Sequence, residues 1–306
     1  MPKPTLLFFG NERLSSGFDA KHAPVLRSLV TGGYPVAAVV SNYEPARSRK
    51  GRSLEIKDIA EAYDIPVLLP DSPRDIIEHL QSYRADAGVL VAYGRIIPQS
   101  IIDLFPAGII NIHPSALPKY RGSTPIESAI LNGDAQLTVS LMALAKEMDA
   151  GPVYAQRDLP LSNSASKHEI TQQALELGAA MLIEHLPAIL DGTLTPLPQD
   201  ESQATYCSLI KKDDSLLDWS KPAVRLAREV RAYAGWPGSK TTVAGIDITV
   251  VEAVANDTSL PSGSVRTDDQ RLLIGTANGS LEITQLRPAG RGTMRAADFL
   301  RGLKNK

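Results

Sequence analysis

An amide and an imidazole stand two residues apart at the end of an apolar run in this chain. The run 108–113 reads GIINIH, and Pro114 follows it directly. If the run is a β-strand, side chains alternate between its faces, so Asn111 and His113 project to the same side. Such a pair can stabilise negative charge that develops on a carbonyl oxygen. The alternative is a polar pair that loop carbonyls satisfy at the strand end.

A carboxylate that could complete this group is Asp149, in the sequence KEMDAGPV. It reaches His113 only if the fold brings this turn over the strand end. Otherwise Asp149-Ala150-Gly151 is an ordinary turn, and spacing leaves both interpretations open. The sequence contains no His-Glu-x-x-His, Walker or cysteine-cluster motif, so we predict no metal site. The single cysteine, Cys207, is interpreted as structural.

The first two-thirds of the chain alternates short apolar runs with stretches of helix length, which is typical of βαβ units around a mostly parallel sheet. Runs such as VAAVV are apolar on both faces, as strands covered by helices on each side should be. We therefore predict a doubly wound α/β fold, with ligands at the carboxyl ends of its strands. The predicted strands are 5–9, 36–40, 67–69, 87–92, 108–113, 137–144 and 152–161.

The chain divides in character near residue 190. A proline-rich, polar stretch follows the long helix predicted around 166–190, and short β-like segments with turn signals follow that stretch. We predict a catalytic domain over 1–190, a linker over 191–206 and a smaller C-terminal β-barrel domain over 207–306.

Charge and hydropathy limit the class of protein. The 306 residues include 43% hydrophobic types and carry a net charge of −2. The last hundred residues hold 15 Lys and Arg against 11 Asp and Glu, so the basic excess lies in the tail. No apolar run approaches the roughly 18 residues of a membrane helix. The first expected strand starts too early for a transit peptide, which favours a bacterial cytosol.

Three separated motifs together resemble the folate-dependent formyltransferases, which use 10-formyltetrahydrofolate. These are VAYGRIIP (91–98), NIHPSALPKYRGSTPIESAILNG (111–133) and MDAGPV (148–153). The family shares an Asn-x-His pair, a Ser-Leu-Leu-Pro-like loop, an Arg-Gly and a distal Asp-x-Gly. The resemblance implies a Rossmann-like catalytic domain, an OB-like C-terminal domain, and a catalytic triad of Asn111, His113 and Asp149.

The folate contacts of that family match two stretches of this chain. By resemblance, the backbone around Arg95, Ile96 and Ile97 lines the pterin pocket, and the loop Ser115, Ala116, Leu117 and Pro118 contacts the folate. Ala116 is smaller than the leucine usual there. Residues 10–20, GNERLSSGFDA, are longer and more polar than the family's GTPDFA, so contacts to the acceptor are expected to differ at this loop.

The acceptor must be inferred from residues outside the shared motifs. Two stretches of the tail are similar to the C-terminal domain of members that formylate methionyl initiator tRNA: 209–243, with its DWS, RA and WPG landmarks, and 286–302. The stretch 44–57 resembles their basic insertion and assigns tRNA contacts to Arg47, Arg49, Lys50 and Arg52, with Arg52 the main one. A solvated basic loop is the alternative. We therefore expect a monomeric, cytoplasmic enzyme that binds folate and initiator methionyl-tRNA and no membrane.

Three other functions stay open from the sequence. Amino-sugar nucleotide N-formyltransferases share the fold and the donor, and some carry related tails. A non-catalytic regulator could keep the fold, although the intact Asn111, His113 and Asp149 argue against it. A folate hydrolase would use water in place of the amine. Enzymes that formylate glycinamide ribonucleotide resemble the chain only to about residue 190, which makes them a poor match to its length.

Overall fold

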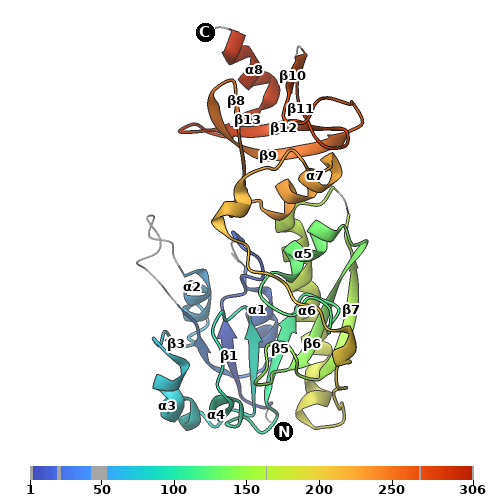
Figure 1. Ribbon diagram of the computed structural model, residues 1–306. Coiled ribbons are helices and arrows are strands. Elements are labelled where there is room, and N and C mark those ends of the chain that lie inside the picture. Colours follow the sequence, from blue (N-terminus) through green and yellow to red (C-terminus); the bar gives the residue numbers. More distant parts are fainter. Residues whose placement is uncertain (1–2, 19–21, 43–53, 163, 269, 305–306) are drawn as a thin grey trace. The chain divides into compact units, whose positions relative to one another are not determined.

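A computed structural model describes residues 3–18, 22–42, 54–162, 164–268 and 270–304 (Figure 1). The chain forms two compact units, one of residues 1–126 and 135–208 and the other of residues 127–134 and 209–306. The segment 191–206, which we predicted as a linker, is part of the first unit. The predicted tRNA contacts Arg47, Arg49, Lys50 and Arg52 lie outside the described residues.

The described part of the first unit contains one seven-stranded sheet with the spatial order β3-β2-β1-β4-β5-β6-β7. Strands β1 to β5 run parallel, whereas the β5–β6 and β6–β7 pairs are antiparallel. The predicted mostly parallel sheet is therefore confirmed, with a hairpin added at one edge. The strands are β1 Leu6–Gly10, β2 Val36–Val40, β3 Val67–Leu68, β4 Ala87–Val91, β5 Ile109–His113, β6 Gln136–Ala143 and β7 Val153–Pro160.

Helices cover both faces of this sheet, as a doubly wound fold requires (Figure 1). Leu7 and Phe9 of β1 belong to a core cluster that also contains side chains of α3 and α4. On the other face α1 packs beside α6, and α6 contacts β6 and β7. The helices are α1 Pro24–Thr31, α2 Glu55–Glu61, α3 Ile77–Ser82, α4 Gln99–Ile102, α5 Pro125–Asn132 and α6 Lys167–Leu190.

Helix α6 fixes which way the side chains of β5 point. A capping box starts the helix, because Ser166 Oγ accepts from Glu169 N and Glu169 Oε2 accepts from Ser166 N. Further along, Gly178 lies so close to β5 that a Cβ there would sit 2.6 Å from Ile112 Cγ2. Ile112 therefore faces α6, and the alternation of a strand turns Asn111 and His113 to the opposite face.

The strand order reverses between β1 and β4. From β1 the chain moves outward to β2 and β3, then returns to β4 on the other side of β1. The loops after these two strands consequently diverge and leave a crevice at their carboxyl ends, which is where doubly wound folds bind ligands. The loop after β1 is also where the sequence departs from the family pattern.

That loop contributes a buried glutamate that caps helix α1. Glu12 is fully buried, and its Oε2 and Oε1 accept hydrogen bonds from Val25 N at 3.1 Å and Leu26 N at 2.9 Å. The residue before the helix, Ala23, has no side chain that could do this. Glu12 thus satisfies two of the free N–H groups that every helix start presents.

Burial of Glu12 makes the stability of the protein depend on pH. It raises the pKa of the carboxyl from 4.5 to about 7, although the two backbone hydrogen bonds and Arg27 lower it. Between these values the folded protein holds a proton that the unfolded chain has released. The free energy of unfolding therefore falls as pH rises through this window, by roughly 3 kcal/mol in total.

Glu12→Gln should remove this dependence. Measured by thermal unfolding, the Tm of the variant relative to that of the parent should rise between about pH 5 and about pH 8, because the substitution removes the buried carboxyl group that ionises there. The amide can accept only one of the two backbone bonds, so the variant should start less stable at the lower pH. Parallel Tm curves for the two proteins would contradict this account.

The described part of the second unit contains an antiparallel sheet with the order β10-β11-β12-β9-β8. The short strand β13 lies outside this order and pairs with β12. It curls around an apolar core shared with α7 and α8, which confirms the predicted small β-domain in the form of an open half-barrel. The elements are α7 Ala223–Ala232, β8 Ser239–Val243, β9 Ile246–Asn256, β10 Val265–Asp268, β11 Arg271–Gly275, β12 Ser280–Pro288, β13 Met294–Arg295 and α8 Ala296–Lys304.

Helix α7 also holds the end of α5 within this unit. Arg225 Nη1 donates to Leu131 O at 2.8 Å and Arg228 Nη1 to Asn132 O at 3.2 Å. These are carbonyls that a helix leaves without an internal partner at its carboxyl end. Among the helices that the structure describes, none is long and apolar enough to cross a membrane.

Candidate active site

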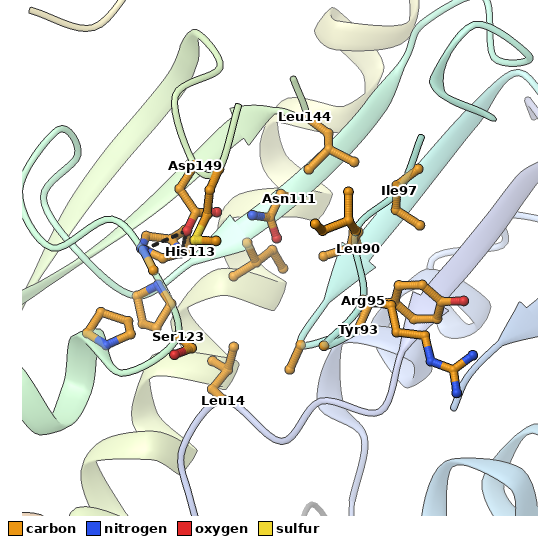
Figure 2. Close-up of a pocket in the computed structure, with 18 of the residues that line it drawn as sticks. Leu14, Leu90, Tyr93, Arg95, Ile97, Asn111, His113, Ser123, Leu144 and Asp149 are labelled. Carbon is orange, nitrogen blue, oxygen red and sulfur yellow. Dashed lines mark hydrogen bonds and ion pairs between the residues drawn. The ribbon is translucent and has the colours of Figure 1, made fainter. Parts of the chain in front are cut away.

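A cavity of about 540 Å³ opens in the first unit where β1, β4 and β5 end (Figure 2). It is therefore located where the strand order reverses. Three irregular segments supply most of its wall, namely residues 11–14 after β1, 92–97 after β4 and 144–149 after β6. Leu90, Ile97 and Leu144 give one side an apolar surface, while Asn111, His113 and Asp149 gather on the other (Figure 2).

Asn111 presents an unused amide to this cavity. The side chain lines the wall and is 5% exposed, and no residue in the described ranges forms a hydrogen bond with it. A nearly buried amide loses much of its contact with water, so its N–H groups are available to a ligand at little further cost. The prediction that Asn111 faces a ligand site from the end of β5 therefore fits the geometry.

His113 has one ring nitrogen committed to the protein. Nε2 lies 3.1 Å from the carbonyl oxygen of Tyr120. Because a carbonyl can only accept, Nε2 carries the hydrogen of that bond, which assigns the tautomer of the neutral ring. Nδ1 is then the nitrogen that gains or loses a proton, and it faces Asp149.

Asp149 is the carboxylate partner of this imidazole. Its Oδ2 lies 3.8 Å from His113 Nδ1, and the two groups form an ion pair when the ring is protonated. The same Oδ2 accepts a hydrogen bond from Gly122 N at 2.8 Å. Gly151 allows the turn to close tightly, since a Cβ there would sit 1.9 Å from Ala143 O. The turn does lie over the strand end, so the structure brings the three predicted catalytic residues together (Figure 2).

The predicted folate residues fall into two groups. Arg95, Ile96 and Ile97 line the cavity, and the Arg95 guanidinium donates to the carbonyls of Pro70 and Asp71. The loop Ser115, Ala116, Leu117 and Pro118 is not among the lining residues. It is tied to the β6–β7 hairpin instead, because Ser140 Oγ donates to Ser115 O at 2.6 Å and Gln156 Nε2 to Leu117 O at 2.9 Å. That this loop contacts the folate stays a prediction.

Sequence reasoning missed part of the wall. The lining also includes Leu144, Ala145, Lys146 and Met148, just before Asp149, and their location after a predicted strand was an available signal. The loop 10–20, where we expected contacts to the acceptor, contributes Asn11, Arg13 and Leu14 to the wall. Arg13 is anchored there by an ion pair of 2.5 Å with Glu55, the first residue of α2.

A metal is not required to explain these residues. Within the ranges that the structure describes, no group of three or more His, Cys, Asp and Glu side chains is arranged to hold an ion. The cavity instead combines a free amide donor, an imidazole with a defined tautomer and a carboxylate. This set can stabilise a developing oxyanion and move protons around it.

Comparison with known proteins identifies the family. Residues 15–186 match the formyl transferase family model, and residues 209–304 match the model of the formyl transferase C-terminal domain. The chain belongs to the formyltransferase family. It is therefore a transferase, and the family's Asn-x-His and Asp-x-Gly motifs are the ones that meet in the cavity.

Individual relatives agree with this membership. The chain is 39% identical, over 92% of its length and 89% of the relative's, to the methionyl-tRNA formyltransferase of Roseiflexus sp. (strain RS-1). Two solved structures share its fold. HypX from Aquifex aeolicus, in complex with tetrahydrofolic acid, has a TM-score of 0.67 at 22% identity over 98% of this chain. The match covers 47% of the HypX chain, so this chain spans about half of its length.

The second structure is the N-formyltransferase from Helicobacter canadensis, in complex with folinic acid and dTDP-3-aminofucose. Its TM-score is 0.67 at 17% identity, covering 92% of this chain and 98% of that one. At such identities both structures bear on the fold alone.

Proposed function

We propose that this formyltransferase moves the formyl group of 10-formyltetrahydrofolate to the amino group of methionyl initiator tRNA, which yields N-formylmethionyl-tRNA and tetrahydrofolate for translation initiation. The observation that carries the proposal is the convergence of the free Asn111 amide, His113 and Asp149 on one cavity. The likeness to a methionyl-tRNA formyltransferase at 39% identity supports this acceptor over an amino sugar.

The cavity suits the folate donor. Its apolar side, with Leu90, Ile97 and Leu144, can pack on a flat ring system. Two buried polar atoms of lining residues, Asn42 Oδ1 and the Tyr93 hydroxyl, have no hydrogen-bond partner within the described ranges. Buried groups of this kind need a partner, and the polar edge of a pterin ring provides one. Bound there, the donor supplies a formyl carbon attached to nitrogen N10.

The residues on the opposite side would act on that carbon. The amino group of methionine forms the new N–C bond, and the bond to N10 breaks. Asn111 Nδ2–H donates to the formyl oxygen as negative charge develops on it. Asp149, directly or through water, accepts the proton that leaves the amine, and His113, when its ring is protonated, delivers the proton on Nδ1 to N10. An α-amino group is partly neutral near pH 7, so attack needs no strong base.

The acceptor is tested by direct comparison. The purified protein is incubated with 10-formyltetrahydrofolate and either methionyl initiator tRNA or an amino-sugar nucleotide, and the formylated product is measured by mass spectrometry. Formylation of methionyl-tRNA, at a rate far above that of the sugar nucleotide, is expected. Product from the sugar nucleotide alone would reassign the enzyme to the amino-sugar N-formyltransferases.

The basic loop remains our proposal for part of the tRNA-binding surface. Neutralising Arg49, Lys50 and Arg52 together should weaken tRNA binding and flatten its salt dependence. Each phosphate that the protein no longer neutralises should reduce the slope of log K against log salt by about 0.7–0.9. Binding is measured by titration at several salt concentrations. An unchanged slope would make this stretch an ordinary solvated loop.

Domain roles and location complete the proposal. The β-domain at 207–306 would bind the tRNA, since the basic excess of the sequence lies there. The catalytic domain would hold the folate. The enzyme would act as a monomer in the cytoplasm, where its tRNA acceptor and the translation machinery are located.

A further inference from the structure

The turn that carries Asp149 is held from outside the catalytic motifs by Gln199. Gln199 Nε2 donates to Asp149 O at 2.8 Å and to Gly151 O at 2.7 Å. Both acceptors are carbonyls, so the orientation of this amide group is defined by its partners. The two bonds bracket Ala150 and fix the backbone on each side of it. Neither Gln199 nor any neighbour in its segment lines the cavity.

Arg121 in turn holds Gln199. Its Nε and Nη2 donate to Gln199 Oε1 at 3.1 Å and 2.8 Å. Nη1 and Nη2 also donate to the Glu201 carboxylate, at 2.9 Å and 2.7 Å. Nη1 donates in addition to the Tyr206 hydroxyl at 3.3 Å. All five N–H donors of the guanidinium are therefore in use, a pattern that a lysine cannot reproduce. Arg121 is 1% exposed, so this arrangement replaces its hydration.

The same stretch of chain also reaches the Asp149 carboxylate. Gly122, next to Arg121, donates through its N–H to Asp149 Oδ2 at 2.8 Å. The backbone of Arg121 is fixed by bonds of 2.8 Å with Thr205 and Cys207. Asp149 has φ 50°, in the left-handed region that non-glycine residues avoid unless their surroundings hold them. The hydrogen bonds from Gln199 and Gly122 are suited to hold it.

We propose that Arg121 and Gln199 are positioning residues that keep the Asp149 carboxylate against His113 during formyl transfer. This inference rests on the proposed function. It gives the segment that we expected to be a linker a part in the active site, since Gln199, Glu201 and Tyr206 all come from it. Misplacing a catalytic group by about 1 Å can cost a hundredfold in rate, so a residue that touches no substrate can still control kcat.

Gln199→Glu isolates this role. The substituted carboxylate keeps an acceptor for Arg121 but has no hydrogens to donate to Asp149 O and Gly151 O. We expect kcat to fall at least about tenfold while KM for both substrates changes less than about twofold. Gln199→Met removes the donors without adding charge. It should likewise lower kcat with little change in KM, and it replaces the first variant if that one fails to fold. Gln203→Glu, an exposed glutamine of the same segment, is the matched control.

A double-mutant cycle separates positioning from a general loss of structure. In an Asp149→Ala background, Gln199→Glu should change kcat less than about twofold, because the carboxylate that Gln199 positions is already absent. An equal loss of kcat in both backgrounds would overturn the inference. So would normal turnover by Gln199→Glu itself.

A second readout does not depend on activity. In histidine-labelled protein without substrates, Gln199→Glu should move the NMR signals of the His113 imidazole toward their positions in Asp149→Ala. His113 signals identical to those of the parent would overturn the inference. This comparison also holds if the protein formylates a different acceptor, so failure of the inference and failure of the proposed function can be told apart.

Discussion

Asn111→Ala is expected to lower kcat at least about a hundredfold while leaving folate affinity nearly unchanged. The reason is that the amide has no hydrogen-bond partner among the described residues and faces the cavity, so its N–H groups are free for the oxygen that becomes negative. A donor of this kind is worth roughly 2.7–4 kcal/mol in the transition state. The ground-state carbonyl gains far less from it, so the loss falls on kcat. Steady-state kinetics with each substrate varied in turn give both constants.

Asn111→Asp provides the comparison for this variant. It keeps the shape of the side chain but replaces donors with a negative charge, so turnover should fall at least as far. Folate binding, measured by fluorescence titration, and the Tm report whether the cavity is intact. Near-normal kcat in Asn111→Ala, with the fold preserved, would remove this residue from the mechanism.

Asp149→Asn is expected to have an effect of similar size, also at least about a hundredfold in kcat. The substitution keeps an oxygen for the hydrogen bond from Gly122 N, so the local structure should persist. It removes the charge that faces His113 Nδ1 at 3.8 Å and the group that accepts the amine's proton. The variant therefore separates the chemical role of the carboxylate from its structural one.

Steady-state kinetics of Asp149→Asn give its kcat, and its Tm reports whether the fold is preserved. A turnover close to that of the parent, with the fold preserved, would contradict a catalytic role for Asp149.

The position of Asn111 and His113 could be predicted because strands obey a simple rule. Alternation along GIINIH determined that both polar groups share a face, and the doubly wound pattern placed that face at the ligand end of the sheet. The structure confirms the fold. Arg95, Ile96 and Ile97 could be assigned to the cavity wall only by resemblance, since no periodic signal extends into the loop after β4.

Hydrogen bonds made by irregular segments could not be predicted in this way. Gln199 lies 50 residues beyond Asp149 in the sequence, in a proline-rich stretch whose composition is typical of a linker. Glu12 caps α1 from 13 and 14 residues away, where no local capping pattern exists. In both cases the hydrogen-bonding partner is determined by how the chain folds back, and side-chain type alone carries no information about it.

The antiparallel hairpin β6–β7 shows a related limit. Its strands were predicted from their apolar residues, but direction depends on the length and course of the connection rather than on those residues. The direction has consequences for the site, because the turn between β6 and β7 is the one that carries Asp149 back to His113. A helical crossover at this position would have placed residues 144–149 elsewhere.

We propose that the cavity transfers a formyl group to an amine and does not hydrolyse the folate. A single-turnover reaction distinguishes the two reactions, with enzyme in excess over 10-formyltetrahydrofolate and saturating methionyl initiator tRNA. We predict that tetrahydrofolate and N-formylmethionyl-tRNA appear at the same rate and in equal amounts, and that both are lost together in Asn111→Ala. Tetrahydrofolate formed at the same rate without tRNA, and without formylated methionine, would contradict it.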